Sequence, residues 1–164
     1  WLSKGATERK NMGIKLVTSE SAIHDEILKE MDRVNRLTLR ALSYLGEKCV
    51  IEARDRSPEE SWIDRTGNLR SSIGYVIASG GKIIKYSDFT VVKNGSEGPE
   101  AGKTLAEEIA RKYRSGYALV VVAGMNYAEY VEAMDNKVVL ASAELFARQQ
   151  LPSMMQKLKS QIAS

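Results

Sequence analysis

The chain has 164 residues, of which 43% are hydrophobic and 27% are charged, and its formal net charge is +3. This length suits one domain with a core of its own, and the composition excludes wholesale disorder. The net charge arises from 24 basic and 21 acidic residues, whereas a dedicated nucleic-acid-binding protein concentrates positive charge more strongly.

Residues 1–20 contain lysines, an arginine, glycines and hydroxyl side chains, a composition that predicts a flexible N-terminal arm. Within this arm Met12, Ile14 and Leu16 alternate with other residues, and this spacing also fits an edge strand. Both interpretations stay open at this point.

From about Ser21 to Arg56 apolar residues recur at spacings of mostly three or four, which predicts one long helix. Its apolar stripe comprises Ile23, Ile27, Met31, Val34, Ala41, Leu45 and Cys49. Pro58 ends the helix. The helix would be about 50 Å long, at about 1.5 Å per residue, which is more than a small domain needs for its own core. We therefore expect part of it to contact a partner.

The rest of the chain alternates between short helical and short strand patterns. We expect a capped helical turn at 64–73, strands at 74–79, 82–86 and 89–94, a loop at 95–102, a helix at 103–114, a strand at 116–124, a helical turn at 126–133, a strand at 137–141, and a closing helix from Ser142 that Pro152 kinks or breaks. These elements predict a single α+β domain over 21–164. In it, the long N-terminal helix and the C-terminal helix pack on a mostly antiparallel sheet of four or five strands.

The sequence offers few residues for catalysis or for holding a metal. Its one histidine, His24, and its one cysteine, Cys49, lie about seven turns apart on the same predicted helix. A zinc site takes several ligands of these types. The stretch GPEAGKT, which contains Lys103, lacks the first glycine of a phosphate-binding loop. We therefore expect no enzymatic activity, no cofactor and no metal site.

A row of basic residues on the long helix raises a second hypothesis. Spacings of four, three and four separate its members Lys29, Arg33, Arg36 and Arg40. Such a row can meet phosphates, and with the basic arm it would suit a nucleic-acid-binding accessory protein. Acidic residues three or four positions away favour a different interpretation, an exposed helix face laced with ion pairs.

Two remaining stretches, RTGNLRSSI (65–73) and NYAEYVEA (126–133), carry a family resemblance. In this order, with strands between them and a long helix in front, they resemble the tail-component family of tailed bacteriophages, described as minor tail, tail-completion or head–tail joining proteins. The matching positions are Thr66, Gly67, Asn68, Leu69, Arg70, Ser72, Ile73, Tyr127, Ala128, Tyr130, Val131 and Glu132. With the flanking helices, the likeness spans about residues 21–164.

The chain also departs from the family pattern. After Val131 and Glu132 it continues with Ala133 and Met134, where the family usually has Gly-Thr. The family's later Pro-Phe is replaced by LASAELF, and residues 94–114 read as an inserted loop and helix. These differences affect the outer surface, and therefore the partner.

The resemblance implies a function as well as a fold. It implies a non-enzymatic structural protein of a phage or prophage neck or tail, which joins the head connector to the tail as an oligomeric ring. Its partners would be further copies of itself and other neck or tail proteins, with no membrane involved. It would be assembled in the bacterial host cytoplasm and reside in the virion.

The two motifs also suggest how the chain folds locally. A sharp turn at Gly67 and Asn68 would let Leu69 pack under the sheet while Arg70 faces outward. Such a turn, capped by Thr66 and Asn68, is typical of the start of a short helix.

The tyrosines of the second motif have two possible roles. Tyr127 and Tyr130 are three residues apart on a helical turn, so both rings could cover the end of the sheet and take part in an interface. They are explained equally well as lids of the core. We expect Glu132 to pair with Arg70, within the subunit or across to a neighbouring one.

Overall fold

The computed structural model describes residues 18–55, 63–133 and 139–164. Contacts divide the chain between Arg33 and Val34, inside helix α1 (Glu20–Arg54), into two units that are described separately. The predicted arm lies outside the described residues up to residue 17, including the alternating Met12, Ile14 and Leu16. The predicted division of the chain into an arm at 1–20 and one domain at 21–164 therefore stays a prediction.

In the first unit the described structure is the start of α1. The hydroxyl of Ser19 accepts a hydrogen bond from the amide of Ala22 at 3.2 Å, which caps the helix. Ile23, Ile27 and Met31 form the predicted apolar stripe, yet they remain 41%, 53% and 55% exposed. The described residues thus leave this part of the stripe uncovered.

The second unit is built on a sheet of three antiparallel strands in the order β2-β1-β3, fewer than the four or five predicted. Its members are β1 (Ile73–Ser79), β2 (Lys82–Tyr86) and β3 (Tyr117–Ala123). The β1–β2 hairpin closes through Gly80 and Gly81, whose φ angles of 58° and 79° favour glycine. The glycine pair was correctly predicted as a turn.

The predicted strand at 89–94 does not form. Phe89 packs instead against Gly74 of β1, where an added Cβ would lie 2.4 Å from the ring. The amide of Val92 donates to the hydroxyl of Ser71 at 2.7 Å rather than to a neighbouring strand. The β-branched residues here favour an extended chain, but a ladder also needs a strand alongside.

The predicted strand at 137–141 does not form at residues 139–141, which the structure describes. Residues 137 and 138 lie outside the described part of the chain. Val139 is buried, and Leu140 is the cap residue of helix α5 (Ala141–Ala163). Helix α5 runs through Pro152 without the break that was allowed for.

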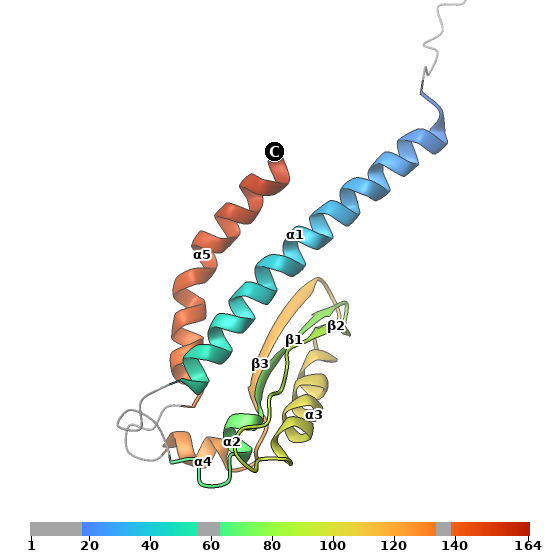
Figure 1. Cartoon of the computed structure of the whole chain (residues 1–164). Helices are drawn as coiled ribbons and strands as arrows, with labels where there is room; N and C mark the ends of the chain where they lie inside the picture. Colours follow the sequence, from blue (N-terminus) through green and yellow to red (C-terminus); the bar gives the residue numbers. More distant parts are fainter. Residues whose placement is uncertain (1–17, 56–62, 134–138) are drawn as a thin grey trace, which may run out of the picture. The chain divides into compact units, whose positions relative to one another are not determined.

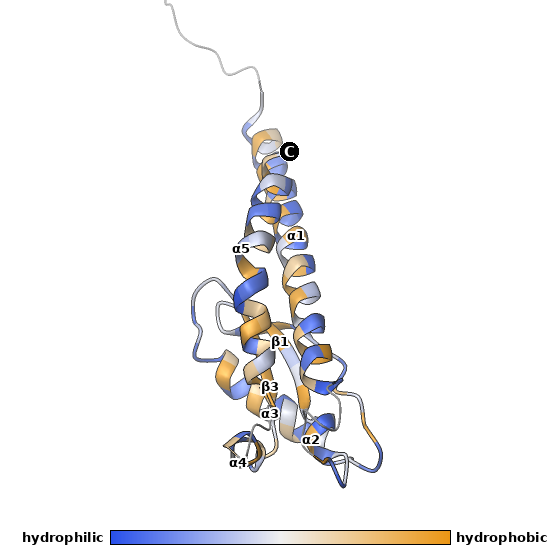
Figure 2. Ribbon diagram, turned by 90° about the vertical axis from the view of Figure 1, so that its left-hand side faces the viewer, coloured by the Kyte–Doolittle hydropathy of each residue, from blue (hydrophilic) through white to orange (hydrophobic). Residues whose placement is uncertain are grey.

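The second unit has three layers, with α1 and α5 on one face of the sheet and α3 (Gly98–Ala110) on the other (Figure 1). Side chains alternate along β1, so Ile73, Tyr75 and Ile77 join the core beneath α1 and α5. Val76 and Ala78 join a second core with Ala106 and Ala110 of α3. Hydrophobic and hydrophilic residues are interspersed along α1 and α5, as expected for helices with one buried face (Figure 2).

Helix α1 approaches the sheet closely at Gly46. An added Cβ there would lie 2.8 Å from the ring of Tyr75. The Tyr75 hydroxyl donates to Oε1 of Glu47 at 2.9 Å, and burial together with this carboxylate raises the pKa of Tyr75 to about 12. Further along α1, the thiol of Cys49 is 1% exposed and lies 3.7 Å from the carbonyl oxygen of Ala143 in α5.

Helix α3 begins five residues before the predicted start at 103, and it closes one side of the molecule's second core. Pro99 fits the first turn of a helix because its missing amide would be unpaired there. The helix in the segment 94–114 thus contributes a layer of the fold, while the status of this segment as an insertion relative to the phage family stays a prediction.

Candidate functional site

The two motifs of the sequence meet at one end of the sheet, and we call residues 64–73 with 124–132 the motif junction. Its first part is the short helix α2 (Asn68–Ser71), and its second part includes α4 (Ala128–Ala133). Helix α2 leads into strand β1, and strand β3 leads into helix α4. The structure therefore brings together stretches that lie more than fifty residues apart.

Asp64 organises the first motif. It is 7% exposed, and its carboxylate accepts the amide of Gly67 at 2.9 Å and the amide of Arg70 at 3.2 Å. The predicted cap Thr66 contributes as well, since its hydroxyl accepts the amide of Asn68 at 3.2 Å. Sequence reasoning missed Asp64, although an aspartate just before a short helix is a common cap.

Gly67 cannot carry a side chain at this position. Its φ is 87°, and an added Cβ would lie 1.9 Å from the carbonyl oxygen of Val92. Gly95 packs against the same point, where its own Cβ would be 2.3 Å from the carbonyl carbon of Gly67. Leu69, two residues on, is 1% exposed, as the turn prediction required.

Ser72 joins the two motifs through its hydroxyl; it is one of the positions that carry the family resemblance, but the sequence indicated no role for it. The hydroxyl donates to the carbonyl oxygen of Leu69 at 2.7 Å. It accepts the amides of Gly124 and Met125 at 3.0 and 3.3 Å, directly before the second motif. Because Ser72 is 0% exposed, water cannot replace these bonds without opening the fold.

Helix α3 lies flush against the junction through glycines. An added Cβ at Gly98 would lie 2.3 Å from the carbonyl oxygen of Asn68, and one at Gly102 would lie 2.4 Å from that of Ser72. Gly124 in turn meets Gly102, with a Cβ distance of 2.3 Å to its amide nitrogen. The glycines of GPEAGKT therefore serve close packing of backbones, while Lys103 is exposed.

A shallow groove of about 390 Å³ opens on the surface of the junction, and we call it the motif groove. Its lining is mixed: six residues are apolar or carry a hydroxyl, and four are charged or carry an amide, namely Ile63, Thr66, Leu69, Met125, Tyr127 and Val131 in the first group and Asp64, Arg65, Asn68 and Glu97 in the second. Ile63 is 73% exposed and Tyr127 is 37% exposed. Burial raises the pKa of Tyr127, and a hydrogen bond with Thr66 offsets part of the rise.

Tyr127 is therefore partly buried over the junction, as a lid of the core would be, and its part in an interface stays a prediction. Tyr130 lies within α4, but its side chain falls outside the described part of the structure.

Glu132 acts as a cap for α5, a role that was not predicted, and its pairing with Arg70 across to a neighbouring subunit stays a prediction. Its Oε1 accepts the amides of Leu140 at 3.0 Å and Ala141 at 2.7 Å. A carboxylate at this end of a helix is favoured, since the first amides are unpaired and carry partial positive charge. Arg70 is half-buried rather than turned fully outward.

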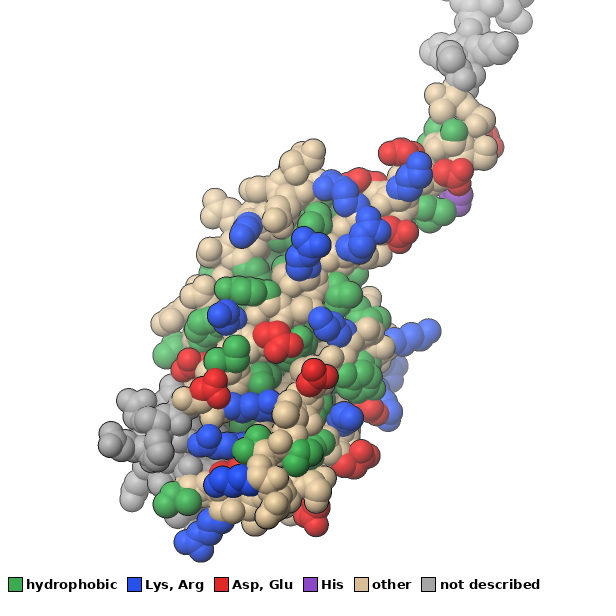
Figure 3. Space-filling view, viewed as in Figure 1, with side chains coloured by type: hydrophobic (Ala, Val, Ile, Leu, Met, Phe, Trp, Pro, Cys, Tyr) green, Lys and Arg blue, Asp and Glu red, His purple; other side chains and the backbone are tan. Residues whose placement is uncertain are grey.

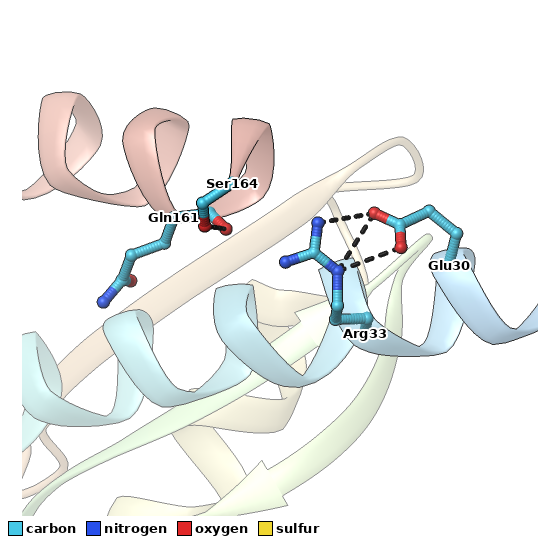
Figure 4. A network of polar contacts seen from close by, with 4 residues as sticks. All are labelled: Glu30, Arg33, Gln161 and Ser164. Carbon is cyan, nitrogen blue, oxygen red and sulfur yellow. Dashed lines mark hydrogen bonds and ion pairs between the residues drawn. The ribbon is translucent and has the colours of Figure 1, made fainter.

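The predicted basic face is partly neutralised. In the first unit, Lys29 lies 3.5 Å from Glu26, and Arg33 holds Glu30 through a bond of 2.6 Å and two longer ones (Figure 4). This hydrogen bond is the main reason that the pKa of Glu30 is lowered. In the second unit Arg36 and Arg40 are exposed. Basic and acidic side chains are also interspersed over the face shown in Figure 3.

Ion pairs of this kind reduce the charge available to phosphates. The nucleic-acid hypothesis therefore gains no support from the face, and salt-dependent retention on DNA remains its test.

No family model, curated protein or solved structure matches this chain. The phage family thus rests on the resemblance of the two motifs. Within the described ranges, no three His, Cys, Asp or Glu side chains gather as a metal site would require. None of the helices in those ranges combines the length and the apolar character needed to span a bilayer.

Proposed function

We propose that this chain is a non-enzymatic structural protein of a phage or prophage neck or tail. It joins the head connector to the tail as a ring of identical subunits, and it resides in the virion after assembly in the host cytoplasm. Its partners are copies of itself and neighbouring neck or tail proteins.

The observation that carries this proposal is the motif junction. The residues that resemble the phage family are distant in sequence, yet Ser72 and Gly124 tie them into one packed unit with a surface groove. The groove exposes Ile63 and Tyr127, which are side chains suited to contact another protein. The uncovered stripe of Ile23, Ile27 and Met31 offers a further apolar surface.

The experiment combines two measurements on the full chain. Light scattering at about 1 to 200 µM, followed by electron microscopy, should show closed rings of uniform size. In phage particles induced from the strain that carries the gene, an antibody against the protein should label the junction between head and tail.

A pair of variants tests the groove itself. Tyr127→Ala should leave folding intact but weaken ring formation and labelling at the junction. Tyr113→Ala, which removes a ring that is 54% exposed just after α3, is the matched control and should do neither. Labelling absent from the head–tail junction, or dispersed in the cell lysate without particles, would contradict the proposed function.

A further inference from the structure

Among the described residues, the outer edge of β3 faces no second strand. β3 pairs with β1 in one continuous register from Ile73↔Ala123 to Ser79↔Tyr117. Bonds from the amide of Gly80 to Gly116 and from the amide of Gly124 to Ser72 fix the hydrogen-bonded positions at the two ends of this ladder. Because these positions alternate, the amides of Val120 and Val122 face β1, whereas those of Leu119 and Val121 face away from it.

These outward groups have no strand beside them in the described part of the chain, where β3 pairs with β1 alone. Leu119 and Val121 are partly exposed, and Tyr117 is 38% exposed. Within the described ranges, the edge from 117 to 121 is therefore left without a neighbouring strand.

The two edges of the sheet differ in how they are protected. Edge strand β2 carries Lys82 and Lys85 and is interrupted by an irregularity opposite Ile77 and Ala78. Lysines and bulges are features by which proteins prevent unwanted strand pairing. Strand β3, with the sequence YALVVVA, has no charged residue, no proline and no break in its register. It is the edge suited to accept another strand.

The chain itself contains a segment suited to this edge. Seventeen residues precede the described structure, and among them NMGIKLV (11–17) places Met12, Ile14 and Leu16 at alternate positions. A strand of seven residues matches the seven of β3. In an added strand these three apolar side chains would face one side of the sheet together.

We propose that residues 11–17 of a second copy of this chain add to the free edge of β3 as a fourth strand. The interface is head-to-tail, since the donor and acceptor surfaces differ, and repetition of such an interface closes a ring when the rotation from one subunit to the next completes a full turn. This inference rests on the self-assembly included in the proposed function.

Hydrogen–deuterium exchange at single-residue resolution tests the pairing on the full chain. When a higher protein concentration drives assembly, the exchange rates of the outward amides of Leu119 and Val121 should fall by about tenfold or more. The inward amides of Val120 and Val122 are the internal reference and should not change. Light scattering on the same samples records whether assembly has taken place.

Two proline variants test the strand pairing, one in the donor segment 11–17 and one in the acceptor strand β3. Each has a control variant that keeps the backbone amide. Ile14→Pro removes an amide in the donor segment, and Ile14→Thr is its control. Val121→Pro removes an outward amide of the acceptor and spares the bonds to β1, with Val121→Thr as its control. Both proline variants should abolish the protection and the assembly, and both threonine variants should retain them. Should Val121→Pro fail to fold, Ile14→Pro alone decides, because residue 14 lies before the described fold.

Different failures point to different errors. Assembly without slower exchange at Leu119 and Val121, or with equal protection in Ile14→Pro, overturns this inference and leaves the proposed function standing. Equal protection at all concentrations overturns it as well, since the added strand would then come from the same chain. A monomer at every concentration contradicts both this inference and the self-assembly on which it rests.

Discussion

Ser72 is fully buried, and its hydroxyl bonds one carbonyl oxygen of the first motif and two amides next to the second. Ser72→Ala removes all three bonds: the amide of Met125 loses this partner, whereas the Leu69 carbonyl oxygen and the Gly124 amide keep only their longer bonds to the Ser72 backbone, at 3.1 and 3.2 Å. We expect it to lower the free energy of unfolding by about 1–3 kcal/mol, measured by urea denaturation. Ser160→Ala is the matched control, because its hydroxyl is exposed on α5, and it should change stability by less than about 0.5 kcal/mol. Equal effects of the two variants would show that the junction does not depend on Ser72.

Gly67 and Gly116 separate backbone conformation from steric overlap. Both have positive φ, 87° and 66°, but a Cβ would meet the Val92 carbonyl oxygen at 1.9 Å in the first case and nothing within 4 Å in the second. Gly116→Ala should therefore cost only about 1–2 kcal/mol of left-handed strain. Gly67→Ala should cost clearly more, because the chain near Val92 must also move. Thermal unfolding of the two variants measures the difference, and equal losses would contradict the close approach seen here.

At this scale the sequence predicted some residue roles and not others. Gly67, Thr66 and Leu69 act as expected because turn formation, capping and burial are local properties. The roles of Asp64, Ser72 and Gly98 depend on which segments lie beside them in the folded chain. No spacing within one stretch indicates that Ser72 will meet the amide of Gly124, fifty-two residues later.

Among the elements, α5 depends on a side chain outside it. Glu132 accepts the first amides of the helix, so Glu132→Ala should lower the free energy of unfolding by about 1 kcal/mol. Glu132→Gln should cost less, since an amide oxygen accepts the same bonds without the charge. Urea denaturation measures both effects, and Glu129→Ala, at an exposed position of α4, is the control.

The same residue distinguishes the cap from the ion pair first predicted. If Glu132 acts as a cap, Arg70→Glu will not restore stability to Glu132→Arg. Recovery in the double variant would show that the pair with Arg70 matters after all.

The contact of α1 with the sheet should make stability depend on alkaline pH. The folded pKa of Tyr75 is raised to about 12, from an ordinary value near 10. Its contribution is fully present below about pH 10 and is lost as the pH rises toward 12, because the unfolded chain releases the proton first. Melting temperatures between about pH 8 and 11.5 should fall less steeply in Tyr75→Phe than in the wild type. Parallel curves would contradict the role assigned to the hydroxyl.

Helices and strands were predictable where one periodicity dominates. The long helix, β1, β2 and β3 were placed within a few residues, since apolar spacing decides them. The start of α3 was not, because GPEAG has the composition of a loop and becomes helical where Gly98 and Gly102 allow two backbones to touch. The segment 89–94 has β-branched residues but no strand beside it, which local propensity cannot indicate.

For the molecule as a whole, the α+β class and the packing of the terminal helices on the sheet were predicted correctly. The number of strands was not, because two β-branched stretches were counted as strands without evidence of partners. A helix was predicted in the segment of α3, but the sequence did not indicate that this helix would cover the second face of the sheet. The strand proposed for the β3 edge would come from a second subunit, and the sequence pattern of one subunit does not determine such a contact.

The position of Cys49 provides a way to time the opening of this fold. The chain has one cysteine, and its thiol is held under α5, where burial raises its pKa. A thiol reagent should therefore modify it only during moments when α1 and α5 separate. The labelling rate in native buffer, divided by that in urea, should give the fraction of time spent open.

The rate of Cys49 labelling should depend on the contacts that hold α5 against α1. Glu132→Ala should accelerate labelling, and Glu129→Ala should not. Rapid modification of the native protein would mean that the two helices part freely. If labelling instead slows as subunits assemble, the contacts between subunits restrain the separation of α1 from α5, and assembly would lock a movement that the free subunit still makes.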